Sequence, residues 1–191
     1  MRASFSTIKS HVLGILKNKL PDFLTYHSIN HTLYVLDRVE YIATREKVSK
    51  EDLFLLKVAT LYHDIGFIKT RVEHEQIGCG IVRKELPDLG FNEKEIDLIC
   101  GMIMATRIPQ QPKTLLEEIL ADADLEYLGT RHFEKVGELL YQELKHYNPN
   151  LTRQEWNDIQ ISFMQSHNYH TRFCKRYKSF RKQNNLDKLK T

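Results

Sequence analysis

The apolar positions of this chain recur at steps of three or four residues, which is the spacing of one face of an α-helix. Val35, Val39 and Ile42 follow this spacing, and so do Leu56 and Ala59. No stretch shows the sustained alternation of apolar and polar residues that is typical of a half-buried strand, and the sequence contains no Asn-Gly or Asp-Gly hairpin turn. The pattern therefore predicts an all-α protein.

Helix starts are marked by Ser, Thr or Asn followed three residues later by an acidic side chain, because such a pair satisfies free amide groups at a helix start from both sides. These pairs are Ser49 with Asp52, Asn92 with Glu95, Thr114 with Glu117, and Thr152 with Glu155. Prolines mark several helix ends and loops. Together these signals predict eight helices, near residues 5–20, 29–46, 51–64, 73–86, 93–106, 115–128, 131–146 and 153–181.

The composition is that of an ordinary globular chain. The length of 191 residues, without an internal repeat or a low-complexity linker, indicates one domain with a sizeable core. Hydrophobic residues make up 41% and charged residues 28%, and no apolar run is long enough to cross a bilayer, so we expect neither disorder nor a membrane partner. Residues 1–20 are predicted as a helix and not as a signal peptide.

The cysteines and the net charge indicate which redox compartment and which partners to expect. The three cysteines, Cys79, Cys100 and Cys174, form no CxxC pair, which argues against a disulfide framework and a thiolate zinc site and favours a reducing cytoplasm. The net charge is +3, and basic residues gather in residues 173–191. A basic end of this kind is more often a solvated helix than a nucleic-acid site, so nucleic acid is disfavoured as a partner.

Titratable side chains share the apolar helix faces. His31 lies on the same predicted face as Val35 and Val39, and His63 lies on the same face as Leu56 and Ala59. Asp64 is turned by about 100° from its neighbour on a helix. Both side chains of the His63-Asp64 pair could still reach one ion if the helix ends there, and Gly66 makes that end plausible.

Two further sites combine polar and apolar positions. The stretch ADADLEYLG offers Asp122 and Asp124 on nearly opposite sides of one predicted helix, and Asp124 is the better interior candidate because leucines precede it on its face. His74 opens another helix whose inward face carries Ile77 and Ile81.

Inward aspartates and histidines need partners, because a buried carboxylate or imidazole without one is costly. A divalent cation would satisfy several of them together, since imidazole and carboxylate oxygen suit zinc, manganese, iron and similar ions. A lone histidine on an apolar face is more often a satisfied core residue, and an aspartate near a helix end is more often a cap. The convergence of three sites favours the metal interpretation.

The order His31, His63-Asp64, Asp124, with LYHDIGF in the middle, resembles the HD-domain superfamily of metal-dependent phosphohydrolases. The resemblance covers five blocks in family order: YHSINHTLYVLDRV, ATLYHDIGF, HEQIGCGIVRKEL, MIMATRIPQQP and EEILADADLEYLG. It implies one all-helical HD domain over residues 1–191, with the motif blocks at 26–129, C-terminal helices at 131–181 and a basic tail at 182–191.

The resemblance also implies a catalytic divalent metal, with Mn, Mg, Zn, Fe, Co and Ni as the candidates. The implied ligands are His31, His63, Asp64 and Asp124. His31 matches the family position better than His27, and Asp122 is an alternative or neighbouring ligand. Family members with two metals carry further histidines. His74 could fill the first of these places, but GMIMATRIP has none for the second, which favours one metal or a weakly held second one.

The activity implied by the resemblance is hydrolysis of a phosphate ester of a nucleotide or another small phosphorylated metabolite. His63 and Asp64 are the catalytic candidates, and Asp64 either completes the coordination or takes a proton from the attacking water. The basic side chains of the neighbouring loops are candidates for binding the phosphate, and His74 could bind it or supply a proton. These basic side chains are Lys69, Arg71 and Arg107.

Three alternatives stay open at this stage. Related domains hydrolyse cyclic nucleotides or cyclic dinucleotides, and others bind metal and nucleotide as sensors without turnover. An iron oxygenase on this fold usually needs two irons, which the missing histidines disfavour.

A homo-oligomer is compatible with the sequence. His167 and His170, three residues apart, favour a structural or substrate-pocket role over a second metal site.

Overall fold

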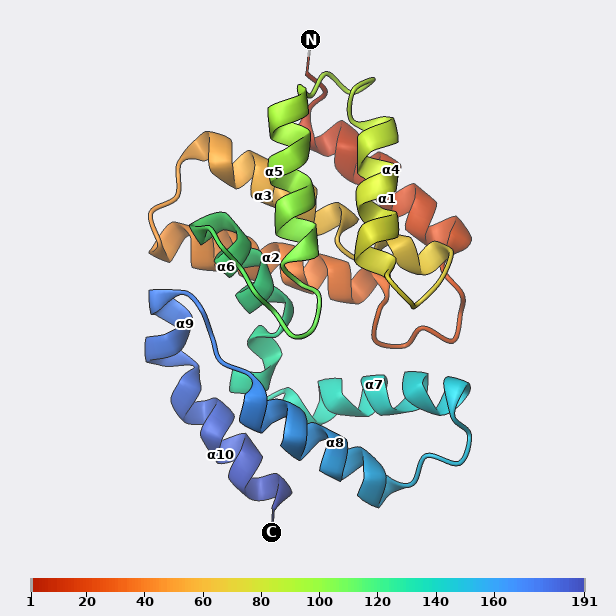
Figure 1. Cartoon of the computed structure of the whole chain (residues 1–191), viewed down its shortest axis with the longest axis vertical. Coiled ribbons are helices and arrows are strands. Elements are labelled where there is room, and N and C mark those ends of the chain that lie inside the picture. The colour runs from red at the N-terminus through yellow and green to blue at the C-terminus, as the bar shows by residue number, and fades with distance from the viewer. Residues whose placement is uncertain (1, 191) are drawn as a thin grey trace.

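The computed structural model describes residues 2–190, and within them it contains ten α-helices, two 3₁₀ helices and no strand, so the predicted all-α class is confirmed (Figure 1). The α-helices are α1 (Phe5–Lys19), α2 (Ile29–Arg45), α3 (Lys50–Tyr62), α4 (His74–Glu85), α5 (Glu93–Met104), α6 (Leu115–Asp124), α7 (Phe133–Tyr147), α8 (Arg153–Ser166), α9 (Arg172–Tyr177) and α10 (Ser179–Leu189). The 3₁₀ helices are η1 (Ile65–Ile68) and η2 (Glu126–Gly129). None of the described helices is both long and apolar enough to cross a bilayer.

The predicted helix starts are observed at all four acidic pairs. Ser49, Asn92, Thr114 and Thr152 are N-caps, and the side chain of each accepts a hydrogen bond from the amide three residues later. At Asn92 and Thr152 the glutamate also accepts from the cap amide, which completes a capping box. Local sequence therefore determines where α3, α5, α6 and α8 begin.

Two groups of helices pack around separate apolar clusters. The larger cluster lies among α1 to α6, with Cys174 of α9 packed into it, and includes the fully buried Val35, Leu56 and Ile99. The smaller one joins η2, α7, α8 and α10 through residues such as Leu128 and Met164. In Figure 1 the first group occupies the half of the molecule near the N-terminus, and α7, α8 and α10 lie in the half near the C-terminus.

The C-terminal part differs from the single helix predicted at 153–181. The chain leaves α8 at His167 with extended backbone, and Thr171 then caps the short α9. The cause is tertiary, since Asp122 on α6 accepts hydrogen bonds from the amides of His170 and Thr171, which holds this segment out of a helix. Periodicity along one segment cannot reveal such a distant acceptor.

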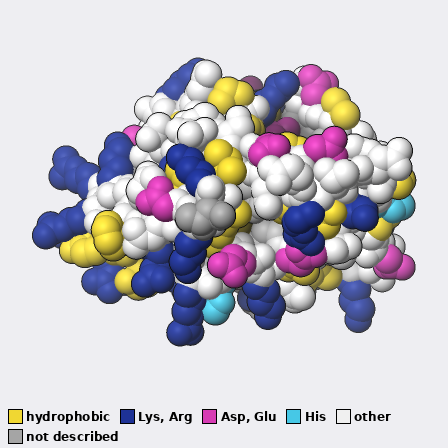
Figure 2. Space-filling view, turned by 90° about the horizontal axis from the view of Figure 1, so that it is seen from below, with side chains coloured by type: hydrophobic (Ala, Val, Ile, Leu, Met, Phe, Trp, Pro, Cys, Tyr) yellow, Lys and Arg dark blue, Asp and Glu magenta, His cyan; other side chains and the backbone are white. Residues whose placement is uncertain are grey.

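The predicted basic tail at 182–191 is also wrong as a tail, because α10 continues as a helix to Leu189. Leu186 and Asn185 of this helix are buried, and Asn185 donates to the carbonyl groups of Leu128 and Thr130. The basic side chains therefore project from packed helices, and Figure 2 shows Lys and Arg gathered at one edge of the molecule. The three cysteines are buried and form no disulfide.

Candidate metal centre

Four polar side chains from three parts of the chain converge between α2, α3 and α6. His31 comes from α2, Asp124 is the last residue of α6, and His63 and Asp64 follow α3. His31 Nε2 lies 2.9 Å from Asp124 Oδ1 and 3.4 Å from His63 Nε2. Asp64 Oδ2 lies 3.1 Å from His63 Nε2 and 3.4 Å from His31 Nε2. The structure thus brings together all four residues that the sequence predicts as ligands.

The end of α3 explains how the adjacent His63 and Asp64 reach one point. The helix stops at Tyr62, and Asp64 adopts φ −104° and ψ 4° before η1 begins, so the two side chains are no longer about 100° apart on one helix. Gly66 allows the start of α4 to pack closely against η1. A Cβ there would lie 1.9 Å from the carbonyl oxygen of His74, so only glycine lets α4 approach this closely.

The hydrogen bonds fix the direction of the histidine lone pair. His63 Nδ1 lies 2.8 Å from the carbonyl oxygen of Thr60 and donates to it, so Nε2 faces the carboxylates and is the atom that can bind a cation when the imidazole is neutral. Asp64 Oδ2 is buried and has no hydrogen-bond donor. The nitrogen of His31, the nitrogen of His63 and an oxygen of Asp124 could all serve one ion, since these atoms lie within 4.8 Å of one another. Imidazole nitrogens and carboxylate oxygens that converge in this way, one of them without a hydrogen-bond partner, are suited to a cation.

The charges of these residues shift one another strongly. Burial lowers the pKa of His63, but the carboxylates of Asp64 and Asp124 outweigh burial and raise this pKa well above its ordinary value. Burial raises the pKa of both aspartates, and the histidines outweigh it, so the pKa of Asp64 falls far below its usual range and that of Asp124 falls to about 2. Both carboxylates are therefore ionised near neutral pH, as metal ligands must be.

Asp122 lies away from this group. Its Oδ1 accepts from the amide of His170 at 2.8 Å, and its Oδ2 accepts from the amide and the hydroxyl of Thr171 at 2.8 and 2.6 Å. Burial raises the pKa of Asp122, and these donors act in the opposite direction. The geometry gives Asp122 a structural role in holding the segment before α9, in place of the alternative ligand role considered from the sequence.

His74 lies beside the convergent group. Its Nδ1 donates to the carbonyl oxygen of Arg71 at 3.1 Å, and its Nε2 lies 3.6 Å from Asp64 Oδ1 and 3.5 Å from Glu75 Oε1. Glu75 is a site residue that the sequence analysis missed. It is 6% exposed, and the signal in the sequence was an acidic residue next to the candidate His74 in the first turn of a predicted helix.

A cavity of about 280 Å³ opens on this centre. Asp64, Asp124 and His74 line it, and so does His27, which the comparison with His31 had set aside. The ring of His27 stacks on Phe67 with centroids 4.0 Å apart. Its Nδ1 lies 2.5 Å from Glu143 Oε1, and Glu143 also accepts from the amides of residues 26 and 27. Residues from α7 therefore help to shape the site, which no local motif could reveal.

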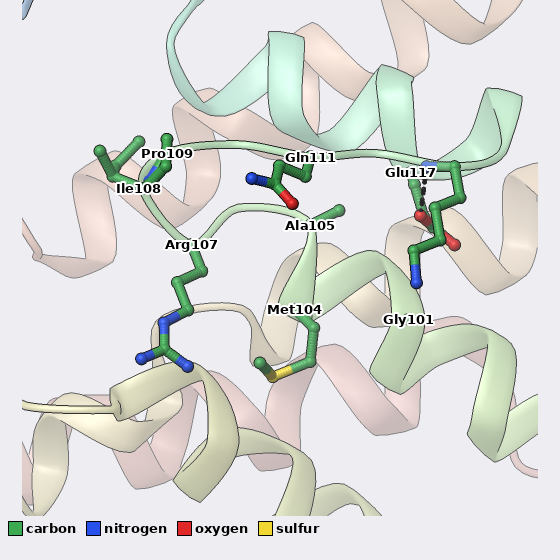
Figure 3. Close-up of a pocket in the computed structure, with 9 residues that line it drawn as sticks. Gly101, Met104, Ala105, Arg107, Ile108, Pro109, Gln111 and Glu117 are labelled. Atoms are coloured by element: carbon green, nitrogen blue, oxygen red, sulfur yellow. Dashed lines mark hydrogen bonds between the residues drawn. The ribbon is translucent and has the colours of Figure 1, made fainter.

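The three predicted phosphate-binding cations are separated by the structure. Arg71 lines the cavity, while Lys69 is exposed beyond the end of η1 and does not line it. Arg107 lines a different cavity of about 420 Å³, and Figure 3 shows it extending from the loop after α5. Its guanidinium pairs with Glu73 at 3.8 Å.

Comparison with known proteins agrees with this arrangement. The HD domain model matches residues 28–126, which is more than half of the chain. The chain belongs to the HD-domain family. The crystal structure of a predicted HD superfamily hydrolase from an uncultured Thermotogales bacterium is similar, with a TM-score of 0.56 and 26% identity over 82% of this chain and 88% of that chain. No curated protein sequence matches this chain.

The family gives the geometry a coarse functional meaning. HD domains bind divalent metals, and many of them are hydrolases. In this chain His31, His63 and Asp124 form a group that could hold such an ion, with Asp64 beside them. The second half of the cavity wall comes from residues beyond 126, outside the family match.

Proposed function

We propose that the protein is a metal-dependent phosphohydrolase that cleaves a phosphate ester of a small metabolite. One observation carries the proposal: the imidazole nitrogens of His31 and His63 and carboxylate oxygens of Asp64 and Asp124 converge beside a cavity, and the buried Asp64 Oδ2 has no hydrogen-bond partner. These residues would hold a divalent ion. When bound, the ion would stabilise charge on a phosphoryl oxygen and make water acidic enough to give a nucleophile near neutral pH.

The remaining side chains of the cavity support the same chemistry. Hydrolysis forms a bond from water oxygen to phosphorus and breaks the ester bond, so one proton must leave the water and one must reach the departing oxygen. Asp64 Oδ1 and His74 Nε2 lie 3.6 Å apart and could accept or return these protons. Arg71 would pair with a phosphoryl oxygen, and its guanidinium is held over the ring of Tyr147 at 5.1 Å.

The test measures metal and turnover together. The purified protein is loaded with Mn²⁺, Mg²⁺, Zn²⁺, Fe²⁺, Co²⁺ or Ni²⁺, and release of phosphate or alcohol is measured with a panel of phosphate monoesters and diesters, nucleotides and cyclic nucleotides included. We expect His63→Ala and Asp64→Ala to lose bound metal and at least about 100-fold in kcat/KM. Asp158→Ala is the control, since Asp158 is an exposed carboxylate on α8.

Two results would contradict the proposal. Full activity in both His63→Ala and Asp64→Ala would show that the reaction does not use this centre. Tight metal binding by the unaltered protein, with no turnover of any ester in the panel, would favour a sensor that binds without catalysis.

A further inference from the structure

The wall of the cavity opposite the metal centre has a different character from the centre itself. From Leu128 onward, every lining residue that the structure describes is apolar except Gln160. This wall includes Phe133 and Leu144 of α7, and Trp156, Ile159 and Phe163 of α8. All of them lie outside residues 28–126, the part that matches the HD domain.

Few basic side chains line the cavity. Arg71 is the only Lys or Arg among the lining residues of the described chain, while Asp64, Glu75 and Asp124 supply carboxylates. A triphosphate or diphosphate would bring several negative charges, and each buried charge needs a partner. One divalent ion and one guanidinium are enough for a single phosphoryl group.

We infer that the substrate is an ester with one phosphoryl group and an apolar aliphatic or aromatic group, and that α7 and α8 bind the apolar group. The inference rests on the proposed function and narrows it from small phosphorylated metabolites to amphiphilic ones. The cavity of about 280 Å³ fits a compact ligand, since pockets for drug-sized molecules span about 300–1,000 Å³. Specificity then comes from the helices that follow the family core.

Trp156 provides a direct readout of binding. It is the one tryptophan of the sequence, it lines the cavity, and it is 4% exposed. Alkylphosphonates from methyl to octyl are the probes, because their P–C bond resists hydrolysis and separates binding from turnover. They are titrated into metal-loaded protein while Trp156 emission is recorded. We expect Kd to fall by up to about 4-fold for each added methylene until the cavity is full.

Two substitutions test the apolar assignment, each at an exposed apolar residue, one on α8 and one on α7. Ile159 on α8 lines the cavity and is 47% exposed, so Ile159→Glu introduces charge at the wall with little risk to folding. We expect it to raise the Kd of octylphosphonate at least about 10-fold and to leave that of methylphosphonate unchanged. Leu139→Glu is the matched control, since Leu139 on α7 is 40% exposed and does not line the cavity.

The outcomes separate this inference from the proposed function. Any one of three results would overturn the apolar assignment, even if hydrolysis is observed. The first is a Kd that does not depend on chain length, and the second is an Ile159→Glu variant that binds octylphosphonate normally. The third is a higher kcat/KM for nucleoside monophosphates and triphosphates than for aryl and alkyl phosphates. Chain-length dependence that Ile159→Glu abolishes would support the assignment, and it would do so even if no ester were hydrolysed and the proposed enzyme activity failed.

Discussion

Asp122 and Asp124 are separated by one residue on α6, yet their carboxylates have unrelated partners. Asp124 Oδ1 lies 2.9 Å from His31 Nε2 in the candidate metal centre. Asp122 accepts three hydrogen bonds from His170 and Thr171, on the segment that leads into α9. One short helix therefore carries a proposed ligand on one side and a structural anchor on the other.

This division predicts opposite effects of two similar substitutions. Asp124→Ala should weaken metal binding by more than about 100-fold, because it removes a carboxylate ligand. Asp122→Ala should lower the free energy of unfolding by about 2–4 kcal/mol, because it leaves buried donors unsatisfied, and should change metal affinity little. Metal titration and denaturant unfolding measure the two effects. If Asp122→Ala abolished metal binding in a protein that remains folded, the assignment of roles would have to be reversed.

The same helix shows how far sequence reasoning reached. The face argument selected Asp124 as the more interior of the two aspartates, but this part of the prediction is wrong, since Asp122 is fully buried and Asp124 is only half-buried. Helix starts followed from local capping pairs. The break between α8 and α9 was missed because its cause, the acceptor Asp122, lies about fifty residues earlier in the chain. His27 and the apolar wall of α8 were missed for a similar reason, since each acquires its role only through contacts between distant segments.

The contact between Gly66 and His74 predicts a strong effect of one methyl group. Gly66→Ala would place a Cβ 1.9 Å from the backbone oxygen of His74, so either η1 or the start of α4 must move. We expect a loss of about 3 kcal/mol in the free energy of unfolding and a weaker metal site, because Asp64 lies two residues away. Thermal unfolding and metal titration provide the measurements.

Gly80→Ala is the matched control for this substitution. Gly80 lies within α4, and a Cβ there would meet nothing within 4 Å. Alanine is favoured over glycine in a helix by up to about 1 kcal/mol, so this variant should be slightly stabilised. Equal stability of the two variants would contradict the close packing of η1 against α4.

Glu143 predicts a positioning effect on the cavity from outside the family core. It is 1% exposed and accepts from His27 Nδ1 and from the amides of Tyr26 and His27. Burial raises the pKa of Glu143, but these hydrogen bonds outweigh it and lower the pKa. Glu143→Gln should cost about 1–3 kcal/mol in stability and should raise KM more than it lowers kcat, since His27 lines the cavity and lies outside the ligand group. An equal loss in kcat with unchanged KM would contradict a positioning role.

His167 predicts a specific dependence of stability on pH. It is 8% exposed at the end of α8, its Nε2 has no hydrogen-bond partner, and burial together with the nearby charge of Lys182 lowers its pKa to about 3. The folded state therefore keeps this imidazole neutral, whereas the unfolded chain takes up a proton below its ordinary pKa of about 6.5. The contribution of His167 to stability is present above about pH 6.5 and is lost as the pH falls toward 3, by about 2 kcal/mol between pH 7 and pH 5.

Denaturant unfolding of the wild type and of His167→Gln at both pH values isolates this contribution, because all other titrating groups are shared. We expect the stability of the variant to fall by about 2 kcal/mol less than that of the wild type over this interval, and equal slopes would mean that His167 titrates normally in the folded protein.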